Sequence, residues 1–294
     1  MKQLVILSGK GGTGKTTVAA ALVHLATRND GAGSRRVVIA DADVDAANLG
    51  LVLAPRTEKV HDFTGGSVAV VDPALCIACG RCAEVCRYEA VREGDVFTVD
   101  PIACEGCGAC SYECPVSAIA MQPQHAGQWF EATTRYGPLY HAHLFAGQEN
   151  SGKLVTLVKQ MARLRAFDED ADLLLVDGPP GTGCPVIATL SGADQALIVT
   201  EPTVSGAHDL ERILGLCAHF QVPAVVLLNK ADLSPTQADA VAASCAALGA
   251  ALIGRLPYDP AVTEAMVRGE PVTASGGPVA SALEHAWEAL QAAL

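Results

Sequence analysis

The chain has 294 residues, enough for one large α/β domain or for a domain with a small inserted module. Its formal net charge is −12, and it lacks any run of Lys or Arg, which argues against a surface that follows nucleic-acid phosphates. No stretch of about 18 apolar residues is present to span a bilayer, and the first predicted strand leaves no room for a leader. We therefore expect a soluble cytoplasmic protein with no nucleic-acid partner and no stable membrane insertion.

A glycine-rich loop between a strand and a helix opens the chain. Residues 4–9 (LVILSG) predict a buried strand, residues 9–16 (GKGGTGKT) fit GxxxxGK[ST], and an Ala-rich helix follows from about 15 to 28. Backbone N–H groups and the helix N-terminus of such a loop bind phosphate. Lys15 is expected to reach the β- and γ-phosphates, and the Thr16 hydroxyl to bind Mg²⁺. The residues expected to hold the nucleotide here are Gly9, Gly11, Gly12, Thr13, Gly14, Lys15, Thr16 and Thr17.

The loop contains a second lysine, Lys10. Its form KGGTGKTT resembles the deviant P-loop of the MinD, ParA, Mrp and nitrogenase iron protein class. The resemblance implies that Lys10 reaches across an ATP-dependent dimer to the partner's nucleotide and acts in catalysis. The partner would be a second copy of the chain or a related ATPase. The alternative is a solvated loop lysine.

Two later predicted strands end in carboxylates, within residues 35–50 (RRVVIADADVDAANLG) and residues 173–183 (LLLVDGPPGTG). Ligands of open α/β sheets bind at the carboxyl ends of parallel strands. By the same resemblance Asp41 lies near Mg²⁺, and Asp43 orients or deprotonates the attacking water. Asp177 is then the Walker B carboxylate, and residues 178–183 form the second switch. The alternative for each aspartate is a helix cap or a turn residue.

Eight of the eleven cysteines lie in two copies of one pattern, CIACGRCAEVCR and CEGCGACSYECP. The spacing CxxCxxCxxxC is that of two-cluster bacterial ferredoxins, in which the fourth cysteine of each run binds the other cluster. We therefore expect two [4Fe-4S] clusters; zinc and disulfides are the alternatives. The first cluster would be held by Cys76, Cys79, Cys82 and Cys114. The second would be held by Cys86, Cys104, Cys107 and Cys110.

The cysteine runs predict a module inserted into the nucleotide-binding domain. We expect residues 71–120 to form a small α+β ferredoxin-like domain, and residues 1–70 and 121–294 to form the P-loop ATPase domain. Alternating strands and helices in residues 121–294 predict an α/β fold with a mostly parallel sheet. The whole chain resembles the MinD-superfamily P-loop ATPases that contain an inserted ferredoxin domain.

The segment AVVLLNKAD, residues 224–232, is expected to contribute the base pocket. Its NKAD sequence fits the guanine-reading pattern NKxD. In the MinD-like class, however, an asparagine at the place of Asn229 reads adenine, and Asp232 would then cap a helix that starts near Ser234. ATP is therefore the favoured nucleotide. Residues 255–260 (RLPYDP) resemble the second base-side loop of the class.

Three cysteines lie outside the two runs. Cys217 and Cys245 follow apolar residues at helical spacing and are expected in the core. Cys184 lies in the second switch, where a packing or regulatory thiol is favoured over a cluster ligand at a dimer interface. His141 and His143 alternate along a predicted strand, and surface histidines are favoured over a metal or phosphate site.

Two predicted helices are amphipathic. The helix at about 152–166 has an apolar stripe, with Lys159 and Arg163 expected on the opposite, polar face. The last helix has an apolar stripe with an acidic polar side, so we expect it to pack on the sheet and not on a membrane.

Two functions remain open from the sequence. In the first, an ATPase couples nucleotide-dependent dimerisation to ferredoxin-type electron transfer or to iron–sulfur cluster handling, with a redox or cluster-accepting protein partner. In the second, a MinD/ParA-like scaffold is switched by ATP for positioning or assembly, and its clusters are structural or redox-sensing. Two intact cluster motifs and the absence of a basic tail favour the first function.

Overall fold

The computed structural model describes residues 1–28, 33–146 and 151–294. The chain divides into two compact units. The first unit comprises Met1–His61, Trp129–His143 and Ser151–Leu294. The second comprises Asp62–Gln128 and the segment that begins at Leu144. The second unit is therefore wider than the module expected at residues 71–120.

A nine-stranded sheet has the order β11-β10-β9-β1-β8-β2-β7-β6-β3. Seven strands, from β11 to β7 in this order, pair in parallel with their neighbours, which confirms the mostly parallel α/β fold. These seven strands are β1 (Lys2–Ser8), β2 (Val37–Asp41), β7 (Gly137–Leu144), β8 (Leu173–Pro180), β9 (Gln195–Thr200), β10 (Ala224–Leu228) and β11 (Ala251–Arg255).

The strands β3 (Arg56–Val71) and β6 (Ile119–Thr134) complete the sheet and were not predicted from the sequence. Each strand belongs to the first unit at one end and to the second unit at the other. Much of β3 is exposed, so it lacks the regular alternation of apolar and polar residues that marks a half-buried strand. Its place in the sheet follows from pairing and not from a local pattern.

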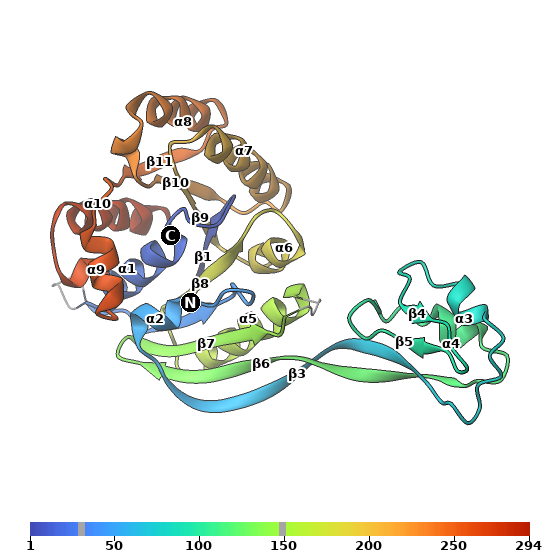
Figure 1. Cartoon of the computed structure of the whole chain (residues 1–294). Coiled ribbons are helices and arrows are strands. Elements are labelled where there is room, and N and C mark those ends of the chain that lie inside the picture. Colours follow the sequence, from blue (N-terminus) through green and yellow to red (C-terminus); the bar gives the residue numbers. More distant parts are fainter. Residues whose placement is uncertain (29–32, 147–150) are drawn as a thin grey trace. The chain divides into compact units, whose positions relative to one another are not determined.

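Helices cover both faces of the sheet in the first unit (Figure 1). Side chains alternate along β1, so Leu4 and Ile6 face a core shared with α1, α2, α9 and α10. On the other face α5 packs against α6, and α7 against α8. The helices are α1 (Lys15–Thr27), α2 (Leu49–Leu53), α5 (Ser151–Asp168), α6 (Cys184–Leu190), α7 (Val204–His219), α8 (Pro235–Ala247), α9 (Ala261–Val267) and α10 (Pro278–Ala293).

The last helix, α10, packs on the sheet as its apolar stripe predicts. Leu283 and Leu290 are fully buried, and Trp287 is 5% exposed in the same core as α1. Two short 3₁₀ helices, η1 (Ala231–Leu233) and η2 (Val272–Ala274), complete this unit. No helix among the described residues is long and apolar enough to cross a bilayer.

The second unit has little regular structure. It contains two short helices, α3 (Arg81–Glu84) and α4 (Ala109–Glu113), and a two-stranded antiparallel sheet of β4 (Val91–Arg92) and β5 (Thr98–Val99). Its apolar core is a small cluster that includes Phe97 and Ile119, with four of the predicted cluster cysteines packed in or against it. Helices of one turn are unstable by themselves. This unit therefore has little regular structure of its own to stabilise it.

Candidate functional site

The glycine-rich loop turns sharply into α1 at Gly14. Gly14 has φ +92° and is the N-cap of the helix. A Cβ on this residue would lie 2.3 Å from Asn229 Nδ2. Only glycine tolerates both the left-handed backbone and the close neighbour. Asn229 Nδ2 donates to the carbonyl of Thr13 at 2.7 Å, so the end of β10 holds the loop.

Lys15 joins the predicted phosphate site to two of the predicted carboxylates. Its Nζ lies 3.1 Å from Asp177 Oδ1 and 3.5 Å from Asp43 Oδ2, and its side chain is 6% exposed. Burial alone would lower the pKa of Lys15, but the charges of Asp177 and Asp43 outweigh burial and raise it. The fold thus brings together three residues that lie far apart in the sequence.

Asp41 lies beside Asp177 in register, on the neighbouring strand. Its Oδ1 accepts the N–H of Asp43 at 3.2 Å, and its Oδ2 accepts the N–H of Leu49, the first residue of α2, at 3.0 Å. Asp41 therefore also accepts a hydrogen bond from the first residue of a helix, as in the alternative that each aspartate is a helix cap. Burial and the adjacent charge of Asp177 raise the pKa of Asp41 to about 8.

The oxygen atoms around Asp177 fit a magnesium site. Asp177 is fully buried, and its Oδ2 has no hydrogen-bond partner among the described residues. Buried carboxylate oxygens are almost always paired, so an unpaired one next to Asp41 indicates a place for a cation or its water ligands. Thr16 follows Lys15 in the first turn of α1 and is partly buried. These residues fit Mg²⁺ bound with a nucleotide.

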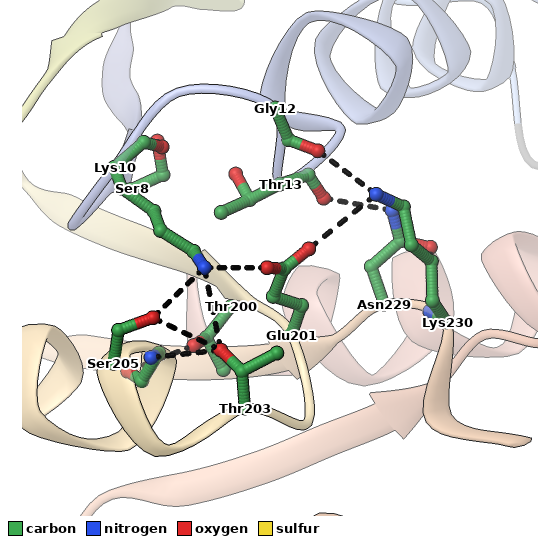
Figure 2. Close-up of polar contacts among 11 residues, drawn as sticks. Ser8, Lys10, Gly12, Thr13, Thr200, Glu201, Thr203, Ser205, Asn229 and Lys230 are labelled. Carbon is green, nitrogen blue, oxygen red and sulfur yellow. Dashed lines mark hydrogen bonds and ion pairs between the residues drawn. The ribbon is translucent and has the colours of Figure 1, made fainter. Parts of the chain in front are cut away.

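Lys10 is held within its own chain (Figure 2). Its Nζ lies 2.6 Å from Glu201 Oε1 and donates to Ser205 Oγ at 3.0 Å and Thr203 Oγ1 at 3.3 Å. Thr203 is the N-cap of α7, where its hydroxyl accepts the N–H of Gly206. Lys10 is therefore not a solvated loop lysine in the described structure.

Glu201 and Lys230 are site residues that sequence reasoning missed. Lys230 Nζ donates to the Gly12 carbonyl at 2.9 Å and lies 3.4 Å from Glu201 Oε2 (Figure 2). Burial would raise the pKa of Glu201, but its hydrogen bond and ion pair with Lys10 and the charge of Lys230 lower it. Glu201 follows the end of β9 as Asp43 follows β2. A carboxylate after a parallel strand was the signal that could have identified it.

Asp232 does not cap the helix near Ser234, and this expectation was wrong. Ser234 precedes α8 without a side-chain cap bond, and Asp232 Oδ1 instead accepts the N–H of Tyr258 at 2.6 Å. The bond links η1 to the loop of residues 256–260. A tertiary acceptor role for Asp232 has no local sequence signal.

The prediction that Lys159 lies on the polar face of α5 was wrong. Its side chain is 7% exposed, and its Nζ donates to backbone carbonyls at the end of α6. Cys184, at the start of α6, is exposed and is not a packing residue. Cys217 and Cys245 are buried, as expected.

The two histidines of β7 differ in environment. His143 is exposed, whereas His141 is half-buried and stacks on Phe130 with ring centroids 4.7 Å apart. His141 Nε2 is buried and has no hydrogen-bond partner among the described residues, and burial lowers the pKa of this histidine. The expectation of two surface histidines therefore holds for His143 alone.

The second unit sorts its eight cysteines into two pockets. Each pocket is lined by three cysteines of one run and the fourth cysteine of the other. The first pocket is lined by Cys76, Cys79, Cys82 and Cys114. The second is lined by Cys86, Cys104, Cys107 and Cys110. All eleven cysteines of the chain are free of disulfide bonds.

The backbone around these pockets is tightly placed. Gly106 has φ +64°, and a Cβ there would lie 2.2 Å from the carbonyl oxygen of Ser67. Ala118 donates its N–H to Cys114 Sγ at 3.2 Å. No group of three or more His, Cys, Asp or Glu side chains among the described residues is arranged for a single metal ion. In a four-iron cube each cysteine binds a different iron, and two groups of four cysteines match the donor sets of two such cubes.

Comparison with known proteins places the chain in a family of P-loop proteins. Residues 4–272 match the family model described as the CobQ/CobB/MinD/ParA nucleotide binding domain. The chain belongs to this family, whose MinD- and ParA-like members are ATPases.

Individual relatives agree with this family. The chain is 34% identical over 232 residues, 79% of each chain, to the uncharacterized protein MJ0578 of Methanocaldococcus jannaschii. It is 30% identical over 133 residues, 38% of this chain and 43% of the relative, to a cytosolic Fe-S cluster assembly factor Nubp1 homolog of Drosophila pseudoobscura pseudoobscura. The structure of the MinD cell division protein of Aquifex aeolicus is similar with a TM-score of 0.58 and 22% identity, covering 99% of this chain and 97% of that one. At this identity the structural likeness shows the fold alone.

Proposed function

We propose that the chain is a magnesium-dependent ATPase that couples its nucleotide cycle to two [4Fe-4S] clusters in the second unit. The clusters would serve electron transfer to or from a protein partner. The observation that carries this proposal is the crossed grouping of cysteines, with Cys114 beside the first run and Cys86 beside the second. If each run bound its own zinc ion, its fourth cysteine would lie with the other three cysteines of the same run.

The nucleotide half of the proposal rests on the contacts of Lys15. Its ammonium pairs with Asp177 and Asp43, and a bound nucleotide would replace these partners by β- and γ-phosphate oxygens. Asp177 and Asp41 would then be available to the magnesium ion and its water ligands. Asp43, the more exposed of the carboxylates, would orient the attacking water.

The base would lie beside the residues that follow β10. Asn229 keeps a second amide hydrogen and a further lone pair after bonding the loop, and these match the N7 acceptor and N6 donor of adenine. Asp232 already accepts the N–H of Tyr258, which favours a structural role over guanine reading. ATP is accordingly the proposed nucleotide.

ATP binding is proposed to bring two copies of the chain, or this chain and a related ATPase, face to face. Lys10 would then leave Glu201 and reach the phosphates of the partner's nucleotide. Its present partners lie on the loop and helix start that follow β9. A movement of Lys10 would therefore alter its hydrogen bonds to the start of α7. Nucleotide binding and dimerisation would then be thermodynamically linked.

The clusters would supply one-electron chemistry when bound. Because each would be held by cysteines from two separate runs, the arrangement favours clusters that are retained. Cluster handling is the second candidate, since one relative is named as a cytosolic Fe-S cluster assembly factor. Transfer of a cluster to an acceptor protein would support cluster handling, and retention of the clusters would support electron transfer.

The proposal is tested by anaerobic purification, with iron and sulfide analysis and ATPase rates measured with oxidised and reduced clusters. We expect about eight irons per chain, magnesium-dependent ATP hydrolysis and a rate that changes with cluster oxidation state. An acceptor apoprotein mixed with the chain should stay free of iron if the clusters are retained. Bound zinc that is stable in air would contradict the cluster assignment. A rate independent of cluster oxidation state would favour the scaffold function instead.

A further inference from the structure

Lys159 is a buried cation on α5. Its side chain is 7% exposed, and Val155, Val158 and Ala162 of the same helix are fully buried. Burial and the nearby charge of Arg163 lower the pKa of Lys159 to about 8, and Lys159 forms no ion pair with a carboxylate among the described residues. Lysines are almost never buried without a partner. The partners of Lys159 are therefore of special interest.

These partners complete the C-terminus of α6. The last four carbonyls of a helix have no intrahelical donor. In α6 the carbonyls of Ile187 and Leu190 accept N–H groups from the residues that follow the helix. The carbonyls of Ala188 and Thr189 accept from Lys159 Nζ, the latter at 3.1 Å. One side chain from a different helix thus satisfies the two acceptors that the backbone leaves open.

The same ammonium also donates a hydrogen bond to the carbonyl of Ser191, the residue that follows α6, at 2.6 Å. A positive charge at a helix C-terminus is favoured by the aligned peptide dipoles. The three carbonyls and the dipole replace the carboxylate that a buried lysine usually needs. Lys159 consequently ties α5 to α6 by contacts that a neutral apolar side chain does not make.

The α6 helix touches the nucleotide site through Thr189. This residue is fully buried, and a Cβ on Gly178 would lie 3.0 Å from its Cγ2. Gly178 directly follows Asp177, whose Oδ2 is the unpaired oxygen of the proposed magnesium site. Closely packed groups transmit a displacement because they have no space to relax. A shift of α6 would therefore displace the strand end that holds Asp177.

The start of α6 is also joined to the site. Helix α6 begins at Cys184, immediately after the switch segment 178–183, and in that segment Gly181 donates its N–H to the carbonyl of Ser8 at 2.9 Å. A Cβ on Gly152, in the first turn of α5, would lie 3.6 Å from Cys184 Cβ. Helix α5 therefore contacts α6 near both ends of α6. The two helices are neighbours in the first unit (Figure 1).

We propose that Lys159 is a positioning residue for ATP hydrolysis. By holding the C-terminus of α6 it fixes Thr189 against Gly178, and so fixes Asp177 and the switch segment in the geometry that turnover needs. The inference rests on the proposed ATPase activity. It assigns to Lys159 an effect on turnover and not on the affinity for ATP, because Lys159 contacts no residue of the glycine-rich loop.

The test compares Lys159→Met with the wild-type chain, because methionine keeps the length of the side chain and removes the charge and the donors. We expect the Kd for Mg-ATP to stay within about twofold and kcat to fall by about tenfold or more. Lys159→Arg, which keeps a charged donor, should recover most of the lost rate. Arg165→Met is the matched control on the exposed side of α5 and should leave both constants unchanged.

A second measurement follows α6 itself. The exposed Cys184 reports on the start of the helix, and its alkylation rate can be measured on its own peptide by mass spectrometry. In the wild type a non-hydrolysable ATP analogue should change this rate, and in Lys159→Met the change should be lost. If the methionine variant does not fold, Lys159→Gln, which keeps two N–H donors, takes its place.

Normal kcat and normal Cys184 response in a folded Lys159→Met would overturn the inference, as would an equal loss of ATP affinity and turnover. A variant with a lower melting temperature but unchanged kcat would show a purely structural role and also overturn it. Failure of the wild-type chain to bind or hydrolyse Mg-ATP would refute the proposed function instead. The two failures are therefore distinguishable.

Discussion

Lys10 Nζ and Glu201 Oε1 lie 2.6 Å apart within one chain, with the lysine side chain 32% exposed and the glutamate 15% exposed. Glu201 also pairs with Lys230, which holds the carbonyl of Gly12. Lys10 cannot keep this partner and also bind phosphate on another subunit. In the ATP-dependent dimer proposed above, this contact would have to break.

Glu201→Gln is expected to favour ATP-dependent dimerisation. Neutralising Glu201 removes the ion pair that Lys10 must leave. A partly exposed pair of this kind contributes about 1 kcal/mol, or about fivefold in the dimerisation constant for each of the two pairs that a homodimer would break. Light scattering with a non-hydrolysable ATP analogue measures the change. Glu288→Gln, on the exposed side of α10, is the control, and Lys10→Ala should lose the dimer altogether. A dimer equally strong in Lys10→Ala would show that Lys10 has no role across the interface.

Lys15 and Asp43 should separate binding from chemistry. Lys15→Ala is expected to weaken nucleotide binding by about a hundredfold, because the phosphates lose their buried positive charge. Asp43→Ala should bind Mg-ATP normally and hydrolyse it about a hundredfold more slowly. Calorimetric binding and phosphate release measure the two effects. Equal loss of binding in both variants would show that the roles are assigned wrongly.

The crossed cysteine pockets predict which substitutions act on the same cluster. Cys79→Ala and Cys114→Ala should each remove about four of the eight irons, and the double variant should lose no more iron than either single one. Cys104→Ala should remove the other cluster, and all of these variants should still bind Mg-ATP. Iron analysis and the electron paramagnetic resonance of the reduced protein provide the measurement. Cys184→Ser is the control and should keep both clusters; additive iron loss in the double variant would disprove crossed ligation.

Asp232 should affect all purine nucleotides alike. Its carboxylate holds the N–H of Tyr258 at 2.6 Å, so Asp232→Ala should loosen the loop of residues 256–260. The Kd values for ATP and GTP should rise by a similar factor, about three- to tenfold for the loss of one exposed hydrogen bond. Competition between the two nucleotides gives the ratio directly. A selective loss of GTP binding would identify Asp232 as a guanine reader.

His24 should contribute to the loss of stability in acid. Burial, together with the charges of Arg28 and Arg135, lowers the pKa of this histidine below its usual 6.5, while its Nδ1 lies 2.8 Å from Thr273 Oγ1. As the pH falls, His24 is therefore protonated at a higher pH in the unfolded chain than in the folded chain. The stability contributed by neutral His24 is present above about pH 6.5 and is lost as the pH falls below it.

Urea unfolding of wild type and His24→Gln between about pH 7.5 and about pH 5 tests this sign. The variant should lose less free energy of unfolding over this interval than the wild type. His219→Gln, on the exposed end of α7, serves as the control. A variant that loses as much stability as the wild type would show that His24 does not carry the effect.

The local motifs were readable in the sequence because their chemistry depends on neighbours along the chain. The loop around Lys15 needs glycines and a following helix, and the structure has both. The cysteine runs predict two crossed groups of four, and the two pockets have that composition. The alternating strands and helices predicted the mostly parallel sheet. In each case the signal lies within a few residues of the site.

Contacts between distant segments were decided by tertiary structure. Strands β3 and β6 owe their place to pairing, since their residues lack a regular apolar pattern. Lys159 was expected on a polar face, yet it is buried because α6 offers it three carbonyls from a helix end. Asp232 lacks a local partner and bonds Tyr258 instead. Such acceptors exist only once the elements have packed.

The division between the two sources of information has a physical reason. Residue type and spacing determine a loop conformation or a set of metal donors, because these depend on dihedral angles and short-range chemistry. A buried charge such as Lys159 and an ion pair such as Lys10 with Glu201 depend on which segments meet, because burial removes water and makes a protein partner necessary. The sequence by itself therefore determined the P-loop fold and the two cysteine groups. Only the tertiary structure decided that Lys10 is held by its own chain and that α6 is held by α5.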